Sequence, residues 1–193
     1  MLPEHVDTKA KLISAAFKLI ELEGDAHFTT RAVCDIAKVT APTLYHHFGS
    51  ADGLLSAVID EAFEQFLAAK KAKAEISDPI EALVEGWNTY VGFAAASPRL
   101  FAAMMARFLS GADLPAARQG QAMLRSNVAQ LDSAGLLAIK PEAAVQVIWA
   151  SVNSAALLYL AATMQSDMAM GTPDAASLAM MRDSAIGMIC KPA

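Results

Sequence analysis

Residues that begin and end helices recur along the whole chain, and this punctuation restricts the fold more than any other feature. Pro79, Pro98 and Pro173 each follow an Asp, Ser or Thr. The polar residue can cap a helix, and proline fits the first turn because its missing N–H needs no helical partner there. Gly24 and Gly135 stand where helices can end, and a long helix is predicted to follow Asp52-Gly53. Between these signals apolar residues repeat at helical spacing. The chain is therefore predicted to be all-α, with about nine helices.

The composition favours helices and indicates an unusual amount of apolar surface to bury. Hydrophobic residues make up 55% of the 193 residues, above the usual share of about 45–50% that includes glycine. Charged residues are only 18%. Val, Ile and aromatic residues are sparse, and no strand or hairpin signal is found. The surplus of apolar side chains suggests a partner subunit or a ligand that covers part of them.

Residues 143–166 carry no charge and are long enough to cross a bilayer, which takes about 20 residues. Polar residues interrupt the stretch and basic flanks are lacking, so a buried helix of a soluble core is the preferred interpretation. Cys34 and Cys190 lie far apart and near no cluster of metal ligands, which favours a reducing compartment. The start of the chain does not resemble a secretion signal. We expect a cytoplasmic protein that does not associate with a membrane.

Residues 29–48 have the pattern of a helix-turn-helix. Thr29 can cap a short helix that reaches about Ala37, and Thr40 can cap a second one with Pro42 in its first turn. Leu44 would anchor this second helix, whose outer face could then enter the major groove of DNA, about 12 Å wide. The side chains predicted to be exposed on it are Thr40, Ala41, Pro42, Thr43, Tyr45 and His46.

This segment resembles the N-terminal domain of TetR-family regulators over about residues 8–55. The likeness consists of an Ala-Ala-x-x-Leu motif at residues 15–19, Gly24, a Thr-Thr pair at 29–30, the run Thr-Leu-Tyr-His-His-Phe at 43–48, and Leu-Leu at 54–55. The resemblance implies a DNA-binding domain at residues 1–52 with three helices. It also implies a helical ligand-binding and dimerisation domain at residues 53–193, whose last two helices form the interface of a homodimer.

The resemblance also implies which residues contact DNA. Thr29, Tyr45 and His46 match positions that touch phosphates, and the residues from Thr40 to Thr43 match positions at or near the bases. The predicted DNA-binding set is Thr29, Thr30, Lys38, Thr40, Ala41, Pro42, Thr43, Tyr45 and His46. Being a dimer, the protein would bind a palindromic operator in double-stranded DNA.

The chain departs from the family pattern in the turn and in its charge. Lys38 replaces the usual glycine, at a cost of about 1 kcal/mol if the backbone there is left-handed. Ala51 replaces a lysine that commonly contacts phosphate. Residues 1–55 hold five Lys and Arg against seven Asp and Glu, whereas a DNA-binding surface usually shows a positive footprint.

Aromatic and methionine side chains in residues 53–193 predict a site for a small apolar ligand, because such pockets are mostly apolar with few polar groups. The candidates are Trp87, Tyr90, Phe108, Met123, Trp149 and Asn153. Some family members have Trp-x-x-x-His-Gly where this chain has Trp149 and Asn153-Ser154, so the role of that histidine does not transfer. The predicted function is a ligand-responsive regulator of transcription, with repression as the family's usual mode.

An enzyme is the competing class. Phosphate-binding loops, nucleophile elbows and metal-ligand spacings are absent from the sequence. His46 and His47 are adjacent on a helix and would point about 100° apart, which does not suit a shared metal. No catalytic activity, cofactor or metal is therefore predicted. The sequence leaves open an activator, a relative that has lost DNA binding and acts through protein or ligand contacts, and a small helical enzyme.

Overall fold

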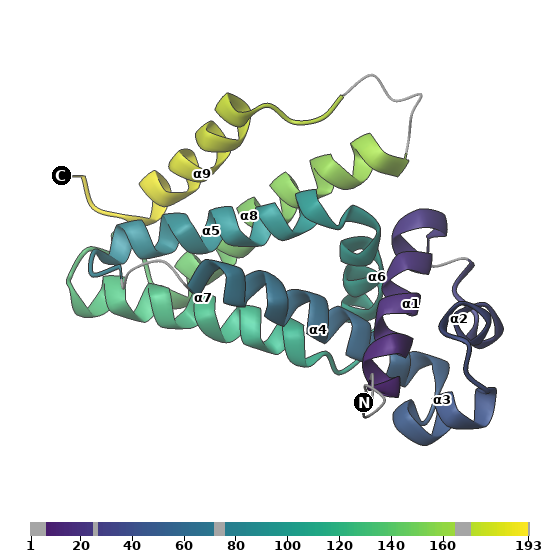
Figure 1. Cartoon of the computed structure of the whole chain (residues 1–193). Helices are drawn as coiled ribbons and strands as arrows, with labels where there is room; N and C mark the ends of the chain where they lie inside the picture. The colour runs from purple at the N-terminus through teal and green to yellow at the C-terminus, as the bar shows by residue number, and fades with distance from the viewer. Residues whose placement is uncertain (1–6, 25–26, 72–75, 165–170, 193) are drawn as a thin grey trace, which may run out of the picture. The chain divides into compact units, whose positions relative to one another are not determined.

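The computed structural model describes residues 7–24, 27–71, 76–164 and 171–192. This part of the chain forms nine helices and no strand, which confirms the all-α prediction (Figure 1). Its one extended pairing is an isolated bridge between Leu137 and Cys190. The helices are α1 (Thr8–Glu23), α2 (Thr30–Ala37), α3 (Ala41–Phe48), α4 (Ala51–Lys71), α5 (Pro79–Ala96), α6 (Pro98–Leu109), α7 (Pro115–Ser133), α8 (Pro141–Met164) and α9 (Ala175–Ile189).

Most helix starts lie where the sequence places them, because short polar side chains satisfy the free N–H groups there. Asp7 accepts a hydrogen bond from the Lys9 N–H at 3.0 Å at the start of α1. Asp78 accepts one from the Ile80 N–H at 2.8 Å at the start of α5. Gly24 ends α1 with a φ of 82°.

Two helices begin at other residues than the punctuation suggests. Helix α9 begins after Asp174 rather than at Pro173, because the Asp174 carboxylate accepts hydrogen bonds from the N–H and hydroxyl of Ser177, each at 2.8 Å. These bonds lower the pKa of Asp174. Helix α4 begins before Gly53 rather than after it, because Ser50 Oγ accepts the Gly53 N–H at 2.9 Å. Gly53 therefore lies inside the first turn of α4.

The chain packs as two compact units, and each is described by itself. The first comprises residues 1–66 and 99–116, and the second comprises residues 67–98 and 117–193. In the first unit α1, α2 and α3 contact one another, and their buried side chains form part of its core. The buried residues of these three helices are Leu12, Ala15, Ala16, Leu19, Ile20, Val33, Cys34 and Leu44. These packing units differ from the predicted DNA-binding domain at residues 1–52 and ligand-binding domain at residues 53–193, and that functional division stays a prediction.

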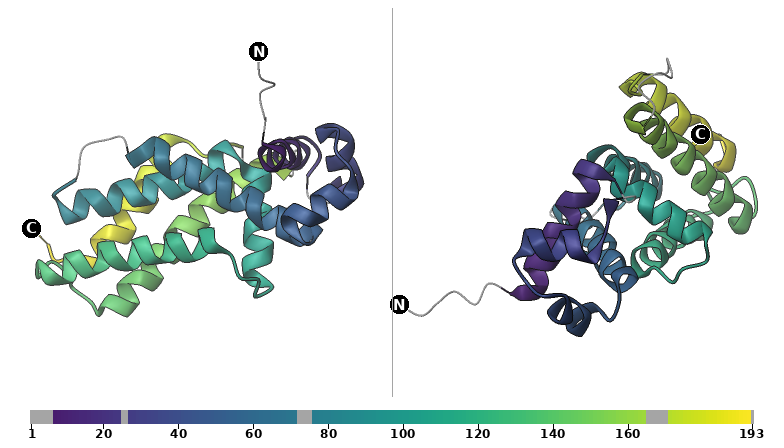
Figure 2. Two further views of the ribbon diagram at one scale, coloured as in Figure 1. Left: turned by 60° about the horizontal axis from the view of Figure 1, so that its bottom comes forward. Right: turned by 90° about the vertical axis from the view of Figure 1, so that its right-hand side faces the viewer.

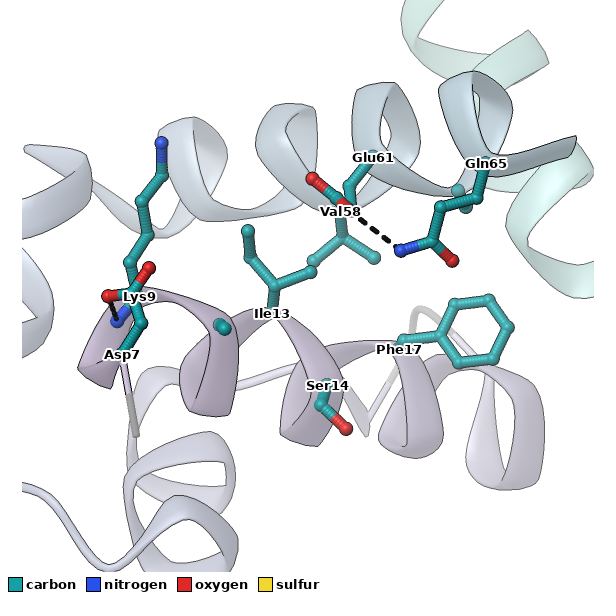
Figure 3. Close-up of a pocket in the computed structure, with 10 residues that line it drawn as sticks. Asp7, Lys9, Ile13, Ser14, Phe17, Val58, Glu61 and Gln65 are labelled. Carbon is teal, nitrogen blue, oxygen red and sulfur yellow. Dashed lines mark hydrogen bonds between the residues drawn. The ribbon is translucent and has the colours of Figure 1, made fainter. Parts of the chain in front are cut away.

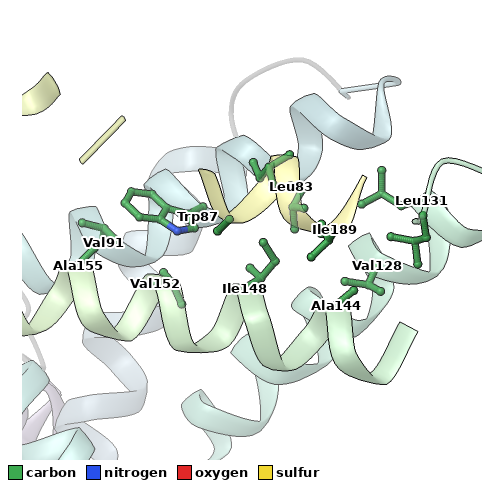
Figure 4. Packing of buried hydrophobic residues seen from close by; sticks show 13 residues of the cluster. Leu83, Trp87, Val91, Val128, Leu131, Ala144, Ile148, Val152, Ala155 and Ile189 are labelled. Atoms are coloured by element: carbon green, nitrogen blue, oxygen red, sulfur yellow. The ribbon is translucent and has the colours of Figure 1, made fainter. Parts of the chain in front are cut away.

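The core of the second unit is built by α5, α7, α8 and α9. Helix α8 packs against both α5 and α9, and Trp87 of α5 lies above Val152 of α8 (Figure 4). Two main-chain hydrogen bonds join the C-terminal end of α9 to the segment between α7 and α8. The Ala138 N–H donates to the Ile189 carbonyl and the Lys191 N–H donates to the Leu136 carbonyl, both at 2.8 Å. Fully buried members include Leu83, Val128, Leu131, Ala144, Ile148 and Ile189.

Helix α8 is the one described helix that is long and apolar enough to cross a membrane, by length and composition alone, over Pro141–Thr163. One of its faces is buried against α5 and α9, but only 28% of its most apolar window is buried. Leu157 on α8 and Met180 and Met188 on α9 are exposed apolar side chains. The two helices lie side by side (Figure 2). Together they present apolar surface that the second unit itself leaves uncovered.

Candidate DNA-binding surface

Local hydrogen bonds define both the start of α2 and the turn that joins it to α3. Thr29 has an extended backbone, and its hydroxyl accepts the Ala32 N–H at 3.2 Å, which confirms its predicted capping role. Lys38 ends α2 in the left-handed conformation, with φ 58° and ψ 43°. The Val39 N–H then donates to the Cys34 carbonyl at 3.1 Å. This reversal lets only three residues separate the end of α2 from the start of α3.

Leu44 determines which face of α3 points outward. Its side chain is fully buried, while Pro42, Tyr45 and His46 are exposed. Successive residues of an α-helix are about 100° apart around the axis. Pro42 and His46 are each two residues from Leu44, so both point almost directly away from the core. The outermost edge of α3 is therefore formed by Pro42 in its first turn and His46 one turn later.

Two hydroxyl groups at the start of α3 bind each other. Thr40 precedes the helix but makes no side-chain bond to its backbone. Its Oγ1 lies 2.9 Å from Oγ1 of Thr43, where one hydroxyl donates to the other. The predicted DNA-binding residues thus form one continuous region of the helix-turn-helix, with Thr30 and Thr43 half-buried and the others exposed. Their contacts with DNA stay predictions.

Helix α6 is joined to the C-terminal end of α1 by a reciprocal pair of contacts. The Arg99 guanidinium donates to the Glu21 carbonyl at 3.3 Å and to the Leu22 carbonyl, where the helix dipole is negative. In return, Glu21 Oε1 accepts the Leu100 N–H at 3.0 Å, where the dipole of α6 is positive. Burial raises the pKa of the Glu21 carboxyl, against the smaller opposing effects of the Leu100 bond and the Arg99 charge.

The other end of α6 is joined to α4. Arg107 donates to Asp52 Oδ1 at 2.9 Å and to Ser56 Oγ at 3.0 Å. Helix α6 therefore connects the end of α1 with the beginning of α4, the helix that directly follows α3. Neither contact is predictable from the sequence, because Arg99 is 78 positions from Glu21 and no local motif marks such a pair.

A groove of 430 Å³ lies between α1 and α4 in the same unit. Ile13 and Val58 form its floor, and Glu61 and Gln65 stand at its rim, joined by a 2.7 Å hydrogen bond (Figure 3). Phe17 lies at one end of the groove. No sequence pattern marks this groove, because its two sides, at Ile13 and Val58, are distant in the chain.

Four of the six predicted ligand-binding residues lie on α5 and α8 in the second unit, and three of them are linked by hydrogen bonds. Tyr90 donates to Asn153 Oδ1 at 3.0 Å, and Asn153 Nδ2 donates to the Trp149 carbonyl at 2.8 Å. Trp87 Nε1 donates to Ser151 Oγ at 3.1 Å, a partner that the sequence analysis missed. Burial raises the pKa of the Tyr90 hydroxyl, so this group is a neutral donor.

The other two predicted ligand-binding residues lie elsewhere. Met123 is on α7, and 36% of its surface is exposed. Phe108 is on α6, which belongs to the other compact unit.

The structure also bears on metal binding and thiol chemistry. Among the described residues no group of three His, Cys, Asp or Glu side chains is placed to hold a metal ion. Burial raises the pKa of the Cys34 and Cys190 thiols, opposite to the shift that makes a thiol reactive.

Residues 12–58 match the model of a family described as bacterial regulatory proteins, tetR family. That range contains α2, the turn and α3 together with every predicted DNA-binding residue. Over this N-terminal segment the chain therefore matches the tetR family. The match confirms the resemblance of residues 8–55 to the helix-turn-helix domain of TetR-family regulators of transcription. No curated protein sequence matches it.

Solved structures agree with the tetR fold along nearly the whole chain. A putative TetR-family transcriptional regulator from Vibrio parahaemolyticus has a TM-score of 0.66 and 17% identity, covering 96% of this chain and 100% of its own. A TetR regulator from Haloarcula marismortui has a TM-score of 0.70 and 17% identity, covering 96% and 99%. FadR from Bacillus subtilis, solved with stearoyl-CoA, has a TM-score of 0.65 and 16% identity, covering 93% and 96%. At such identities the likeness shows the fold.

Proposed function

We propose that the protein is a dimeric repressor that binds a palindromic operator through α3 and leaves it when a small apolar ligand binds the second unit. The observation that carries the proposal is the outward face of α3. Leu44 holds the helix from inside, while Pro42, Tyr45 and His46 remain free to meet the edges and phosphates of a major groove.

Two observations support the proposal that a small ligand binds the second unit. The Tyr90–Asn153–Trp149 chain places a few hydrogen-bonding groups among apolar helices, which is typical of small-molecule sites. FadR from Bacillus subtilis, which shares the fold, was solved in complex with stearoyl-CoA, a small molecule with an apolar acyl chain and a charged CoA moiety. A ligand can act as an inducer only if it binds the conformation that is released from DNA more tightly.

An electrophoretic shift with the intergenic DNA upstream of the gene tests DNA binding. The wild-type protein is expected to shift this DNA at nanomolar to micromolar concentrations. Tyr45→Phe removes one exposed hydroxyl from α3 and should weaken binding about tenfold, the usual effect of one lost hydrogen bond to a charged group. Tyr159→Phe removes the same atom from α8 and should leave binding unchanged. A wild-type protein that shifts no DNA would favour the alternatives, a relative without DNA binding or a helical enzyme.

A thermal-shift screen tests the ligand class. Apolar compounds should raise the melting temperature of the protein and also release it from DNA. Tyr90→Phe removes the hydrogen-bond donor to Asn153 and should weaken the binding of these compounds. Hits confined to phosphorylated or polycarboxylate compounds would contradict an apolar ligand that is poor in negative charge.

A further inference from the structure

The recognition helix lacks the side chains that usually read purines. None of the eight residues of α3 is Arg, Lys, Asn or Gln, the residues that form paired hydrogen bonds with guanine or adenine. The hydroxyls of Thr40 and Thr43 are bound to each other at 2.9 Å. Since each hydroxyl has one proton, the pair has only one left to donate outward. Hydrogen-bonded reading of bases by this helix is therefore limited.

The side chains at the front of α3 are apolar instead. Ala41 and Pro42 are both exposed in the first turn, and Pro42 points away from the buried Leu44. The N-terminal residues of a recognition helix contact the base edges. The pyrrolidine ring has no donor or acceptor, and its attachment to the main chain holds it rigid. Pro42 can therefore contribute only contacts between apolar atoms.

The major-groove edge of DNA offers one apolar group, the C5 methyl of thymine. We infer that Pro42, with Ala41 beside it, selects a thymine in each half-site of the operator by packing against this methyl group. The inference rests on the proposed binding of DNA by α3, and it names the feature that this DNA must contain. Burying one such carbon group changes affinity by about fourfold.

The test uses operators recovered by the full-length protein from a random pool of duplex DNA. Each thymine is replaced in turn by deoxyuridine, which differs only by the missing methyl group, and affinity is measured by fluorescence anisotropy at fixed salt. One position in each half-site should show about fourfold weaker binding. With Pro42→Ala the same replacement should change affinity less than twofold. Pro79→Ala, which also replaces a helix-starting proline but in α5, should retain the full effect.

The outcomes separate the inference from the proposed function. If no sequence is enriched from the pool, both are wrong. If an operator is enriched but deoxyuridine has no effect at any position, DNA binding stands and methyl reading is wrong. If a sensitive thymine exists and Pro42→Ala remains fully sensitive to it, the assignment to Pro42 is wrong.

Discussion

Lys38 occupies a backbone conformation that suits glycine better than lysine. With φ at 58° and ψ at 43°, its Cβ lies close to the following carbonyl oxygen, which costs about 1 kcal/mol or more for a side chain other than glycine. Lys38→Gly should therefore raise the free energy of unfolding by about 1 kcal/mol, measured by chemical denaturation. Lys38→Ala keeps the Cβ and should give no gain. An equal gain from both variants would show that the lysine side chain, and not its backbone, is unfavourable.

Glu21 should make stability depend on pH in an unusual direction for a carboxyl group. Burial raises its pKa in the folded protein above the ordinary 4.5, so the folded state binds a proton more readily than the unfolded state. Its contribution to stability is therefore fully present below pH 4.5 and is lost as pH rises through the higher folded pKa. Glu21→Gln removes this titration while keeping an acceptor for the Leu100 N–H.

Denaturation midpoints between pH 4 and 7 measure this effect. The stability of the wild type relative to Glu21→Gln should fall as the pH rises and then level off. A relative stability that rises with pH would mean that Arg99 and the Leu100 N–H outweigh burial.

Individual residues were predictable where the cause is local. The Thr29 cap and the strain at Lys38 follow from neighbours within a few positions, and the structure confirms both. Arg99 and Glu21 were not predictable, because their meeting depends on how α6 packs against α1. The same holds for Trp87 and Ser151, which are 64 residues apart.

At the scale of elements, the junction between α3 and α4 depends on the absence of a side chain at Gly53. A Cβ there would lie 2.1 Å from the Phe48 carbonyl oxygen, closer than any real contact, so main chain would have to move. Gly53→Ala should destabilise the protein by several kcal/mol, in the range of overpacked cores and strained backbones. Ser50→Ala removes only the cap of α4 and should cost about 1 kcal/mol.

Thermal unfolding of the two variants measures the difference. Gly53→Ala should also weaken DNA binding at temperatures where it is folded, because α3 is displaced. Equal stability of Gly53→Ala and Ser50→Ala would contradict the tight junction.

The helices were largely predictable as elements, because the helix propensity of the residues, the helical spacing of apolar side chains and the capping residues agree along most of the chain. The exceptions are the starts of α4 and α9, where Ser50 and Asp174 form caps at positions that Gly53 and Pro173 had seemed to mark. Both cases show a side-chain hydrogen bond deciding between neighbouring start positions. Which helices pack together was implied only by the family resemblance, because contacts between distant segments leave no pattern in a single sequence.

At the scale of the whole molecule, the low positive charge of the N-terminal region should make DNA binding weakly dependent on salt. Each neutralised phosphate contributes about −0.9 to the slope of log affinity against log salt. If Arg31 and Lys38, the basic residues of the helix-turn-helix, supply the contacts, a dimer should show a slope of about −4. Lys38→Gln should make the slope shallower by about 2, and Lys140→Gln, outside the DNA-binding region, should not change it. A slope steeper than about −8 would require further basic residues at the DNA.

The apolar surface of α8 and α9 predicts a dimer that one charge can break. Pairs of these helices from two subunits would form a four-helix bundle and bury Leu157, Met180 and Met188. The wild type should therefore sediment as a dimer at micromolar concentration. Leu157→Glu would place an unpaired carboxylate in that interface, at a cost of several kcal/mol, and should sediment as a monomer.

Leu109→Glu is the matched control for this experiment. Leu109 on α6 is 75% exposed, against 60% for Leu157, so the same substitution adds the same charge to an apolar residue outside α8 and α9 that is at least as accessible. It should remain dimeric, and circular dichroism should show native helix content for both variants. The monomeric Leu157→Glu should also lose cooperative binding to the two half-sites, which a two-fold dimer places about 34–36 Å apart or a multiple of that distance. A monomeric wild type, or monomers from both variants, would contradict an interface formed by α8 and α9.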